Sequence, residues 1–241
     1  MGIFNFKQFS IDDSHSAMKV GTDAVLLGAW ADLTGFKTIV DAGCGSGVIA
    51  LMAAQRSEEN PVHIIGIDIS ADACEDARHN VEASPWKDRV EVMESDITHV
   101  FPEVIHPLMI ISNPPFFNES LRSPDSMRAL ARHGEEFGVE SLLKLASVHF
   151  SFSEDSLAFI APTSRTDEIE FMLSLHRLAP RRICKVYSKE GKESKRTLWQ
   201  VGRDGCETVP LCREELYIHS SDNKFTLQYQ TLTSPFYLDR D

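Results

Sequence analysis

The fold is decided by Thr38-Ile39-Val40-Asp41-Ala42-Gly43-Cys44-Gly45-Ser46-Gly47, a short apolar run that leads into glycines at alternate positions. An apolar helical pattern follows over residues 47–56. Alternate glycines let the backbone turn tightly and approach a ligand, and the N-terminus of the next helix offers unpaired N–H groups and a positive dipole end. The stretch predicts a strand, a turn and a helix that bind a nucleotide-like cofactor in a doubly wound sheet, with contacts from Gly43, Gly45 and Gly47.

Two carboxylates are expected on the same rim as this turn. Asp68 lies 21 residues after Gly47, at the end of a second apolar run, where a carboxylate can accept both ribose hydroxyls of a cofactor. Asp41 can reach the amino end of the cofactor, directly or through water. For both residues the alternative role is capping of a helix or turn. A nicotinamide cofactor would use a similar glycine turn, so this motif does not define the reaction.

The chemistry is indicated by Asn113-Pro114-Pro115-Phe116, which follows the apolar run 108–112. An adenine amine is a poor nucleophile because its lone pair is delocalised into the ring. The Asn113 side-chain oxygen and the Pro114 carbonyl can accept its two hydrogens and aim the lone pair at an electrophile. The two prolines hold that carbonyl rigidly, and Phe116 offers the base a stacking face. The alternative is an Asn-Pro turn that simply ends a strand.

Three further residues are candidate cofactor contacts with structural alternatives. Asp96 follows the run 89–93 and can accept a hydrogen bond from an adenine amino group, or it can open a turn. Lys19 and Thr22 precede an apolar helix and can contact the carboxylate of the cofactor. That helix can also be a packing element with Thr22 as its N-cap.

Apolar runs and helical stretches alternate along the chain and predict a parallel α/β sheet with helices on both faces. Five strands are expected at 38–41, 62–68, 89–93, 108–112 and 157–161. Four later runs, at 182–187, 197–203, 215–219 and 225–229, predict an antiparallel edge. The length of 241 residues fits one α/β domain, 1–241, with an N-terminal extension at 1–37, a cofactor-binding core at 38–162 and edge strands with a basic region at 163–241.

Composition excludes several classes of protein. The five cysteines form no Cys-x-x-Cys pair, so neither a disulfide framework nor a metal site is expected. No apolar run approaches the ~18 residues that span a bilayer, and the start of the chain has no secretory signal, so we expect a cytoplasmic protein without membrane contact.

The net charge of −12 argues mildly against a nucleic-acid partner, but residues 177–203 hold nine basic side chains against two acidic ones. The candidate phosphate contacts are Arg122, Arg128, Arg132, His133, Lys185, Lys189, Lys192, Lys195 and Arg196. Each of them can equally belong to a solvated face. Trp86 and Trp199 are expected to pack in the core.

In these residues the chain resembles the bacterial tRNA adenine-N6 methyltransferases that modify valine tRNA next to the anticodon, within the class I S-adenosylmethionine-dependent superfamily. The resemblance covers nearly the whole chain. It is carried by Phe6-Lys7-Gln8-Phe9, Lys19-Val20-Gly21-Thr22-Asp23, Leu51-Met52-Ala53-Ala54-Gln55-Arg56, Ser84-Pro85-Trp86, Asn113-Pro114-Pro115-Phe116-Phe117, Ala131-Arg132-His133 and Phe236-Tyr237-Leu238.

The resemblance implies a Rossmann-like fold with a mostly parallel, seven-stranded sheet, S-adenosyl-L-methionine as cofactor, and transfer of a methyl group to N6 of the adenine 3′ of the anticodon. Asp68 stands where Glu is common in the family, and Phe116 where Tyr is common; both keep the chemical role. Three other activities are alternatives. A protein glutamine N5-methyltransferase usually has an N-terminal helical domain, and a DNA adenine methyltransferase needs a separate recognition region. A non-catalytic RNA-binding module would have no need of an intact methyl-transfer motif.

Overall fold

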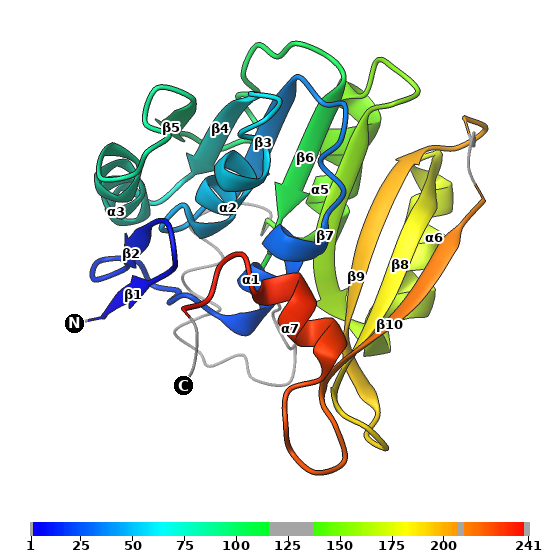
Figure 1. Cartoon of the computed structure of the whole chain (residues 1–241). Helices are drawn as coiled ribbons and strands as arrows, with labels where there is room; N and C mark the ends of the chain where they lie inside the picture. Colours follow the sequence, from blue (N-terminus) through cyan, green and yellow to red (C-terminus); the bar gives the residue numbers. More distant parts are fainter. Residues whose placement is uncertain (1, 116–136, 207–209, 239–241) are drawn as a thin grey trace, which may run out of the picture.

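The computed structural model describes residues 2–115, 137–206 and 210–238, and its centre is an eight-stranded sheet (Figure 1). The strand order is β10-β8-β9-β7-β6-β3-β4-β5. The first five strands of this sheet along the chain all pair in parallel, as buried apolar runs joined by helices predict. They are β3 (Thr38–Ala42), β4 (His63–Asp68), β5 (Val90–Glu94), β6 (Leu108–Ser112) and β7 (Ser156–Pro162).

The sheet has eight strands rather than the seven expected, and three of them form its C-terminal side. This side consists of β8 (Leu178–Lys189), β9 (Ser194–Arg203) and β10 (Cys212–His219). β9 is antiparallel to both β7 and β8, as expected, whereas β10 pairs with β8 in parallel. The sheet therefore ends in a parallel strand, because the chain returns to the start of β8 before it forms β10.

The strand expected at residues 225–229 is wrong. This segment opens helix α7 (Leu227–Thr233), and Phe225 makes only an isolated bridge with His219. The Thr226 hydroxyl accepts a hydrogen bond from the Tyr229 N–H at 3.1 Å, so Thr226 is an N-cap. The cap directs the chain into a helix despite its β-prone composition.

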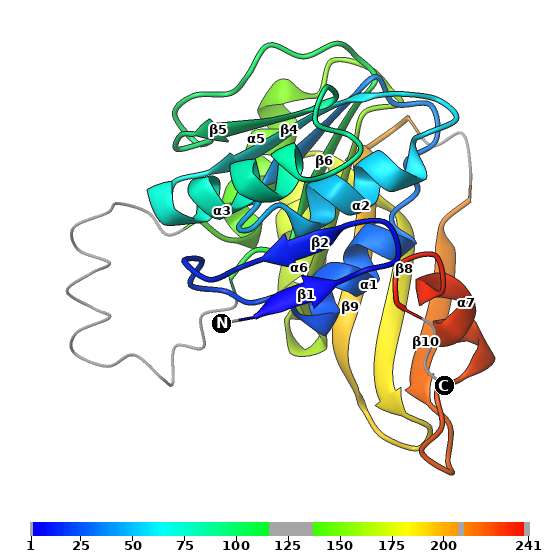
Figure 2. The same ribbon diagram turned by 60° about the vertical axis from the view of Figure 1, so that its left-hand side comes forward.

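Helices cover both faces of the sheet (Figures 1 and 2). One face carries α1 (Thr22–Trp30), α2 (Val48–Arg56), α3 (Ala71–Glu82) and α7; the other carries α5 (Val139–His149) and α6 (Thr166–Leu175), which follows the short 3-10 helix η2 (Thr163–Arg165). Each face has its own cluster of buried apolar side chains. The expected N-cap role of Thr22 is wrong: Gly21 occupies the N-cap position, and Thr22 is the first helical residue.

The two ends of the described chain meet at a bridge between Phe6 and Tyr237. A hairpin of β1 (Ile3–Asn5) and β2 (Ser10–Asp12) precedes α1, and Phe6 bridges to Tyr237. The Phe6 ring stacks on Phe9 at 4.6 Å, and Phe9 packs edge-on against the buried Trp86. None of the helices in the described part of the chain is long and apolar enough to cross a membrane.

Candidate active site

The glycine turn joins β3 to α2 at the carboxyl edge of the sheet. Gly43, Gly45 and Gly47 have φ angles of 73°, 54° and 82°, the left-handed region that only glycine adopts without strain. The Gly43 N–H donates to the Ile67 carbonyl at 2.8 Å, so the turn lies against the end of β4. A Cβ atom on Gly47 would lie 3.4 Å from that of Ala77, which leaves little room for any other residue.

Asp68 fixes this turn from the end of β4. One carboxylate oxygen accepts a hydrogen bond from the Gly45 N–H at 2.8 Å, and the other accepts one from the Ser70 N–H at 2.9 Å. Ser70 in turn caps α3, as its sequence position predicts. Each carboxylate oxygen keeps a lone pair for a further donor. The geometry is compatible with the ribose-binding role expected for Asp68.

Asp41 is fully buried at the end of β3. One of its oxygens accepts a hydrogen bond from the Ala50 N–H at 3.0 Å, and the other has no partner among the described residues. Burial raises the pKa of this carboxyl to about 7. A buried oxygen without a partner is uncommon and marks a place where a ligand donor fits.

Asn113 directly follows β6, which lies next to β3. The sheet reverses its strand order between these two strands, and ligands of doubly wound sheets bind at this point. The Ser112 hydroxyl donates to the Ala42 carbonyl at 2.6 Å and ties the two strand ends together. The side-chain oxygen of Asn113 is buried and has no hydrogen-bond partner in the described part of the chain.

The residues after Asn113 are described only in part. Pro114 is buried and Pro115 is half-buried, while Phe116 lies outside the described residues. The structure thus brings the Asn-Pro-Pro backbone to the strand next to the glycine turn. Two buried oxygens without a partner in the described ranges, one on Asp41 and one on Asn113, flank this rim.

Asp96 also lies on the carboxyl edge, just after β5, but its side chain serves a turn. It accepts hydrogen bonds from the Thr98 N–H at 2.9 Å and the Thr98 hydroxyl at 2.6 Å, and it pairs with His99 Nδ1 at 2.9 Å. The Thr98 hydroxyl bond is the main reason that the pKa of Asp96 is below its ordinary value. Of the two roles considered for this residue, the observed contacts show the turn.

The Lys19 ammonium is engaged within its own segment. It donates to the carbonyls of Asp13 and Ser16 and lies 3.7 Å from an Asp13 carboxylate oxygen. Thr22 is exposed at the start of α1. Neither side chain contacts the glycine turn directly.

Asn80 links the N-terminal segment to the glycine turn, a role that its sequence position does not reveal. Its amide donates to the Asp12 carbonyl at 2.8 Å and to the Ser46 carbonyl at 3.0 Å, and its oxygen accepts from the Asp12 N–H. Asn80 is buried on α3. The signal in the sequence was a polar residue at a buried position of the helix, a position type that Asp76 shares.

Two apolar residues also adjoin the site. Ile69, directly after Asp68, is 64% exposed, which is unusual for a large aliphatic side chain beside a buried strand. A Cβ atom on Gly43 would lie 3.6 Å from the Phe137 ring. The apolar residue after the rim carboxylate could have been noticed in the sequence.

The basic residues divide into engaged and free side chains. Arg196 donates to Asp23 at 2.8 Å, and Lys189 donates to Asn223 at 2.8 Å. The side chains of Lys185, Lys192 and Lys195 are exposed, and their ammonium groups have no partner among the described residues. The other candidates, Arg122, Arg128, Arg132 and His133, lie outside the described residues. Trp86 and Trp199 are buried, which confirms that they pack in the core.

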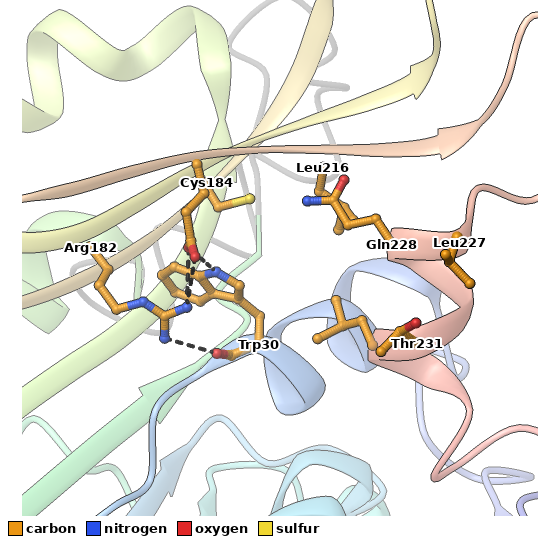
Figure 3. Close-up of a pocket in the computed structure, with 9 residues that line it drawn as sticks. Trp30, Arg182, Cys184, Leu216, Leu227, Gln228 and Thr231 are labelled. Carbon is orange, nitrogen blue, oxygen red and sulfur yellow. Dashed lines mark hydrogen bonds and ion pairs between the residues drawn. The ribbon is translucent and has the colours of Figure 1, made fainter.

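A cavity of about 540 Å³ lies elsewhere, between α1, α7, β8 and β10 (Figure 3). Its charged groups are paired with one another. The Trp30 indole N–H donates to Glu214 at 2.8 Å, and the Arg182 guanidinium lies over the Trp30 ring and 3.1 Å from the Glu214 carboxylate. The cavity is lined by none of the predicted site residues. Within the described ranges, no group of three or more His, Cys, Asp or Glu side chains could hold a metal ion.

A doubly wound sheet with a glycine turn, a rim carboxylate and an Asn-Pro-Pro sequence at the switch point defines a class I S-adenosylmethionine-dependent methyltransferase. The model of the methyltransferase small domain matches residues 14–139. A predicted O-methyltransferase from Agrobacterium tumefaciens has a similar crystal structure, with a TM-score of 0.65, 22% identity, and coverage of 89% of this chain and 96% of that one. A Listeria monocytogenes structure described as a class I S-adenosylmethionine-dependent methyltransferase gives a TM-score of 0.55 at 15% identity over 88% of this chain and 66% of that one.

The sequence relatives define the family more narrowly. The tRNA1(Val) (adenine(37)-N6)-methyltransferase of Aeromonas hydrophila is 40% identical over 98% of this chain and 97% of its own length. The chain belongs to the tRNA1(Val) (adenine(37)-N6)-methyltransferase family. S-adenosyl-L-methionine is the cofactor of this class, and the two rim oxygens that lack a partner among the described residues fit such a ligand.

Proposed function

We propose that this protein transfers the methyl group of S-adenosyl-L-methionine to N6 of an adenine in tRNA, the adenine 3′ of the anticodon of valine tRNA. The observation that carries the proposal is the buried oxygen of Asn113 at the switch point, next to the glycine turn, which has no partner within the described ranges. The relative from Aeromonas hydrophila is named a tRNA1(Val) (adenine(37)-N6)-methyltransferase, and this name supports valine tRNA as the methyl acceptor. The reaction takes place in the cytoplasm, where tRNA is modified.

Asn113 and Pro114 orient the amine. The Asn113 oxygen accepts one N–H of the adenine amine and the Pro114 carbonyl accepts the other, which draws the nitrogen toward tetrahedral geometry. The burial of the Asn113 oxygen, without a donor from the described residues, supports this role, because such an acceptor is otherwise costly. The adenine must leave its stack to reach this position, and Phe116 is predicted to stack on it.

No dedicated strong base is required in this scheme, because the amine becomes acidic as it gains the methyl group. The cofactor supplies an electrophilic methyl group on a sulfonium. The protein contributes position and two fixed acceptors. These contributions act mainly as the transition state develops.

The cofactor is held by the rim residues. Asp68 accepts the ribose hydroxyls, and its bond to the Gly45 N–H supports this assignment because it aims the carboxylate across the turn. Asp41 receives the amino end of the cofactor at its second oxygen, the one without a partner among the described residues. Gly43, Gly45 and Gly47 let the backbone approach the ligand, and Ile69 packs on the adenine ring of the cofactor.

The remaining candidates have narrower roles. Asp96 lies beside the cofactor site at the end of β5. Its carboxylate accepts a hydrogen bond from the Thr98 hydroxyl, so its contribution to the cofactor site comes from its position. Lys19 and Thr22 close over the carboxylate of the cofactor only if the contacts of Lys19 with the 13–16 segment rearrange. Residues 1–241 act together as one methyltransferase domain.

The test is methyl transfer from labelled S-adenosylmethionine to total RNA and, separately, to a protein extract, followed by nucleoside and amino-acid analysis. The proposal predicts label in N6-methyladenosine from the tRNA fraction. Label confined to protein glutamine would replace it with the glutamine methyltransferase alternative. The absence of any turnover would favour a non-catalytic RNA-binding module.

A further inference from the structure

Two tyrosines form a stacked pair at the outer end of the sheet. Tyr187 on β8 and Tyr217 on β10 are direct cross-strand partners, with ring centroids 4.6 Å apart and ring planes within 12° of parallel. Both rings are partly exposed. Stacked aromatic residues on a solvent-facing strand end are a surface on which a further flat ring can stack.

A single carboxylate fixes both rings. Glu215, two residues before Tyr217 on β10, accepts the Tyr187 hydroxyl at 3.0 Å and the Tyr217 hydroxyl at 2.9 Å. Both phenol O–H groups therefore donate to the same carboxylate, which links the two rings at their hydroxyl ends. Because the rings are already held in place, a ligand that stacks on them has little side-chain entropy to remove.

The pair lies on the same edge of the sheet as Asn113. β8 runs in the direction of β6 and β7, so the carboxyl ends of all three strands lie at that edge. Across the sheet, Tyr187 lies three strands away from Asn113, a distance of about 14 Å. Along the strand direction it lies about three residues farther toward the carboxyl end, a distance of about 10 Å. Nucleotides a few positions away from an adenine bound at Asn113 can therefore reach the tyrosines.

On the side of Tyr187 that is turned toward β9, the cross-strand partner is a small residue. The residue opposite it on β9 is Ser194, whose hydroxyl lies 2.9 Å from that of Thr163. A serine cannot cover a phenol ring. The inner side of the pair thus offers a ring face bordered by hydroxyl groups, which can hydrogen-bond the edge of a base.

Two lysines lie on the β8–β9 side of the pair. Lys185 is two residues before Tyr187 on the same face of β8, and Lys195 is the extra residue of the bulge between the Val186 and Tyr187 pairings. Both side chains are exposed and unpaired within the described ranges. On a chain with a net charge of −12, two free lysines beside an aromatic pair are complementary to a phosphate backbone with unpaired bases.

We propose that Tyr187 and Tyr217 form a stacking platform for an unpaired nucleobase of the RNA substrate, while Lys185 and Lys195 contact the adjacent phosphates. The inference rests on the proposed function. It adds a second site of RNA recognition, a few nucleotides away from the methylated adenine. Stacking is tolerant of base identity, so the platform positions the loop, and Asn113 selects the adenine.

The test uses valine tRNA and an RNA hairpin with the same anticodon loop, in which 2-aminopurine replaces single loop nucleotides other than the target. Tyr187→Ala and Tyr217→Ala should each raise KM for tRNA and Kd for the hairpin about tenfold, with kcat and cofactor Kd unchanged. Tyr217→Phe keeps the ring and should change KM by less than about threefold. Phe152→Ala is the matched control, because Phe152 is an exposed aromatic residue near His106, at the opposite edge of the sheet.

At one loop position, the wild-type protein should quench 2-aminopurine fluorescence, and the alanine variants should not. Normal tRNA methylation with unchanged KM and quenching in both alanine variants overturns the platform and leaves the proposed function intact. Tyrosine-dependent quenching without methyl transfer keeps the platform and overturns the proposed function. If neither the tRNA nor the hairpin binds the wild-type protein, both are overturned.

Discussion

The Asp68 carboxylate accepts a hydrogen bond from the backbone N–H of Gly45 at 2.8 Å. This contact joins the end of β4 to the middle of the glycine turn, across 23 residues of sequence. It places the expected ribose acceptor and the expected backbone cradle of the cofactor in one rigid unit. A change at Asp68 therefore acts both on the ligand contact and on the shape of the turn.

Asp68→Ala should weaken S-adenosylmethionine binding by about 1.5–3 kcal/mol, because a charged acceptor is removed and the Gly45 N–H is left without its partner. Calorimetric titration measures the effect. Asp72→Ala is the matched control, since Asp72 is an exposed acid in the first turn of α3. Equal affinity in the Asp68 variant and the control would remove Asp68 from the cofactor site.

Asn113→Ala should lower turnover by about 100-fold or more and leave cofactor affinity almost unchanged, because the amide acts on the acceptor amine as the transition state develops. Single-turnover methyl transfer and calorimetry on the same preparation separate the two effects. A variant that methylates tRNA at a near-wild-type rate is incompatible with the mechanism.

Cofactor affinity should depend on pH through Asp41. Burial raises the pKa of this carboxyl to about 7 in the free protein, so it is mostly neutral below that pH and charged above it. The cofactor ammonium prefers the charged form, so affinity should rise from about pH 6 to about pH 8, by at most about tenfold per unit. Asp41→Asn should abolish this dependence. A parallel pH profile in wild type and variant would place Asp41 away from the ammonium.

The affinity for tRNA should fall steeply with salt, because lysine–phosphate contacts release counterions. Lys192→Gln combined with Lys195→Gln should reduce the slope of log affinity against log salt by about 0.7–0.9 for each lysine that binds a phosphate in the wild-type protein. Lys37→Gln is the control, because Lys37 is exposed just before β3, at the opposite edge. An unchanged slope in the double variant would show that the turn between β8 and β9 does not bind RNA.

Asp155 should stabilise the fold without affecting the chemistry. It is fully buried; burial opposes its charge, but bonds from His106 and from the N–H groups of Leu108, Phe152 and Ser151 lower its pKa below the ordinary 3.8. Its contribution is therefore present above about pH 4 and disappears as pH falls through the lowered value.

Asp155→Asn should accordingly cost about 3 kcal/mol or more of unfolding free energy at about pH 7 and progressively less toward about pH 2. Urea melts at both pH values measure the difference. Glu154→Gln, a change at an exposed neighbour, should stay within about 0.5 kcal/mol of wild type. A cost that is the same at both pH values would contradict the charged-acceptor role of Asp155.

Most of the features that the sequence predicted correctly are local. The glycine turn, the five parallel strands and the Ser70 cap each depend on a few neighbouring residues, and all are present. The pairing of β10 with β8 and the bridge from Asn80 to Ser46 depend on residues far apart in the chain, which no local pattern encodes. The expected strand at residues 225–229 is wrong because a single capping threonine outweighs β propensity.

The most direct test of the central claim is mass-spectrometric mapping of valine tRNA after reaction with the wild-type protein and S-adenosylmethionine. Two transcripts are compared, one with the natural adenine 3′ of the anticodon and one with guanine there. We predict one N6-methyladenosine, at that position, in the first transcript and none in the second. Methylation of both transcripts, or of neither while protein glutamine is methylated, would contradict it.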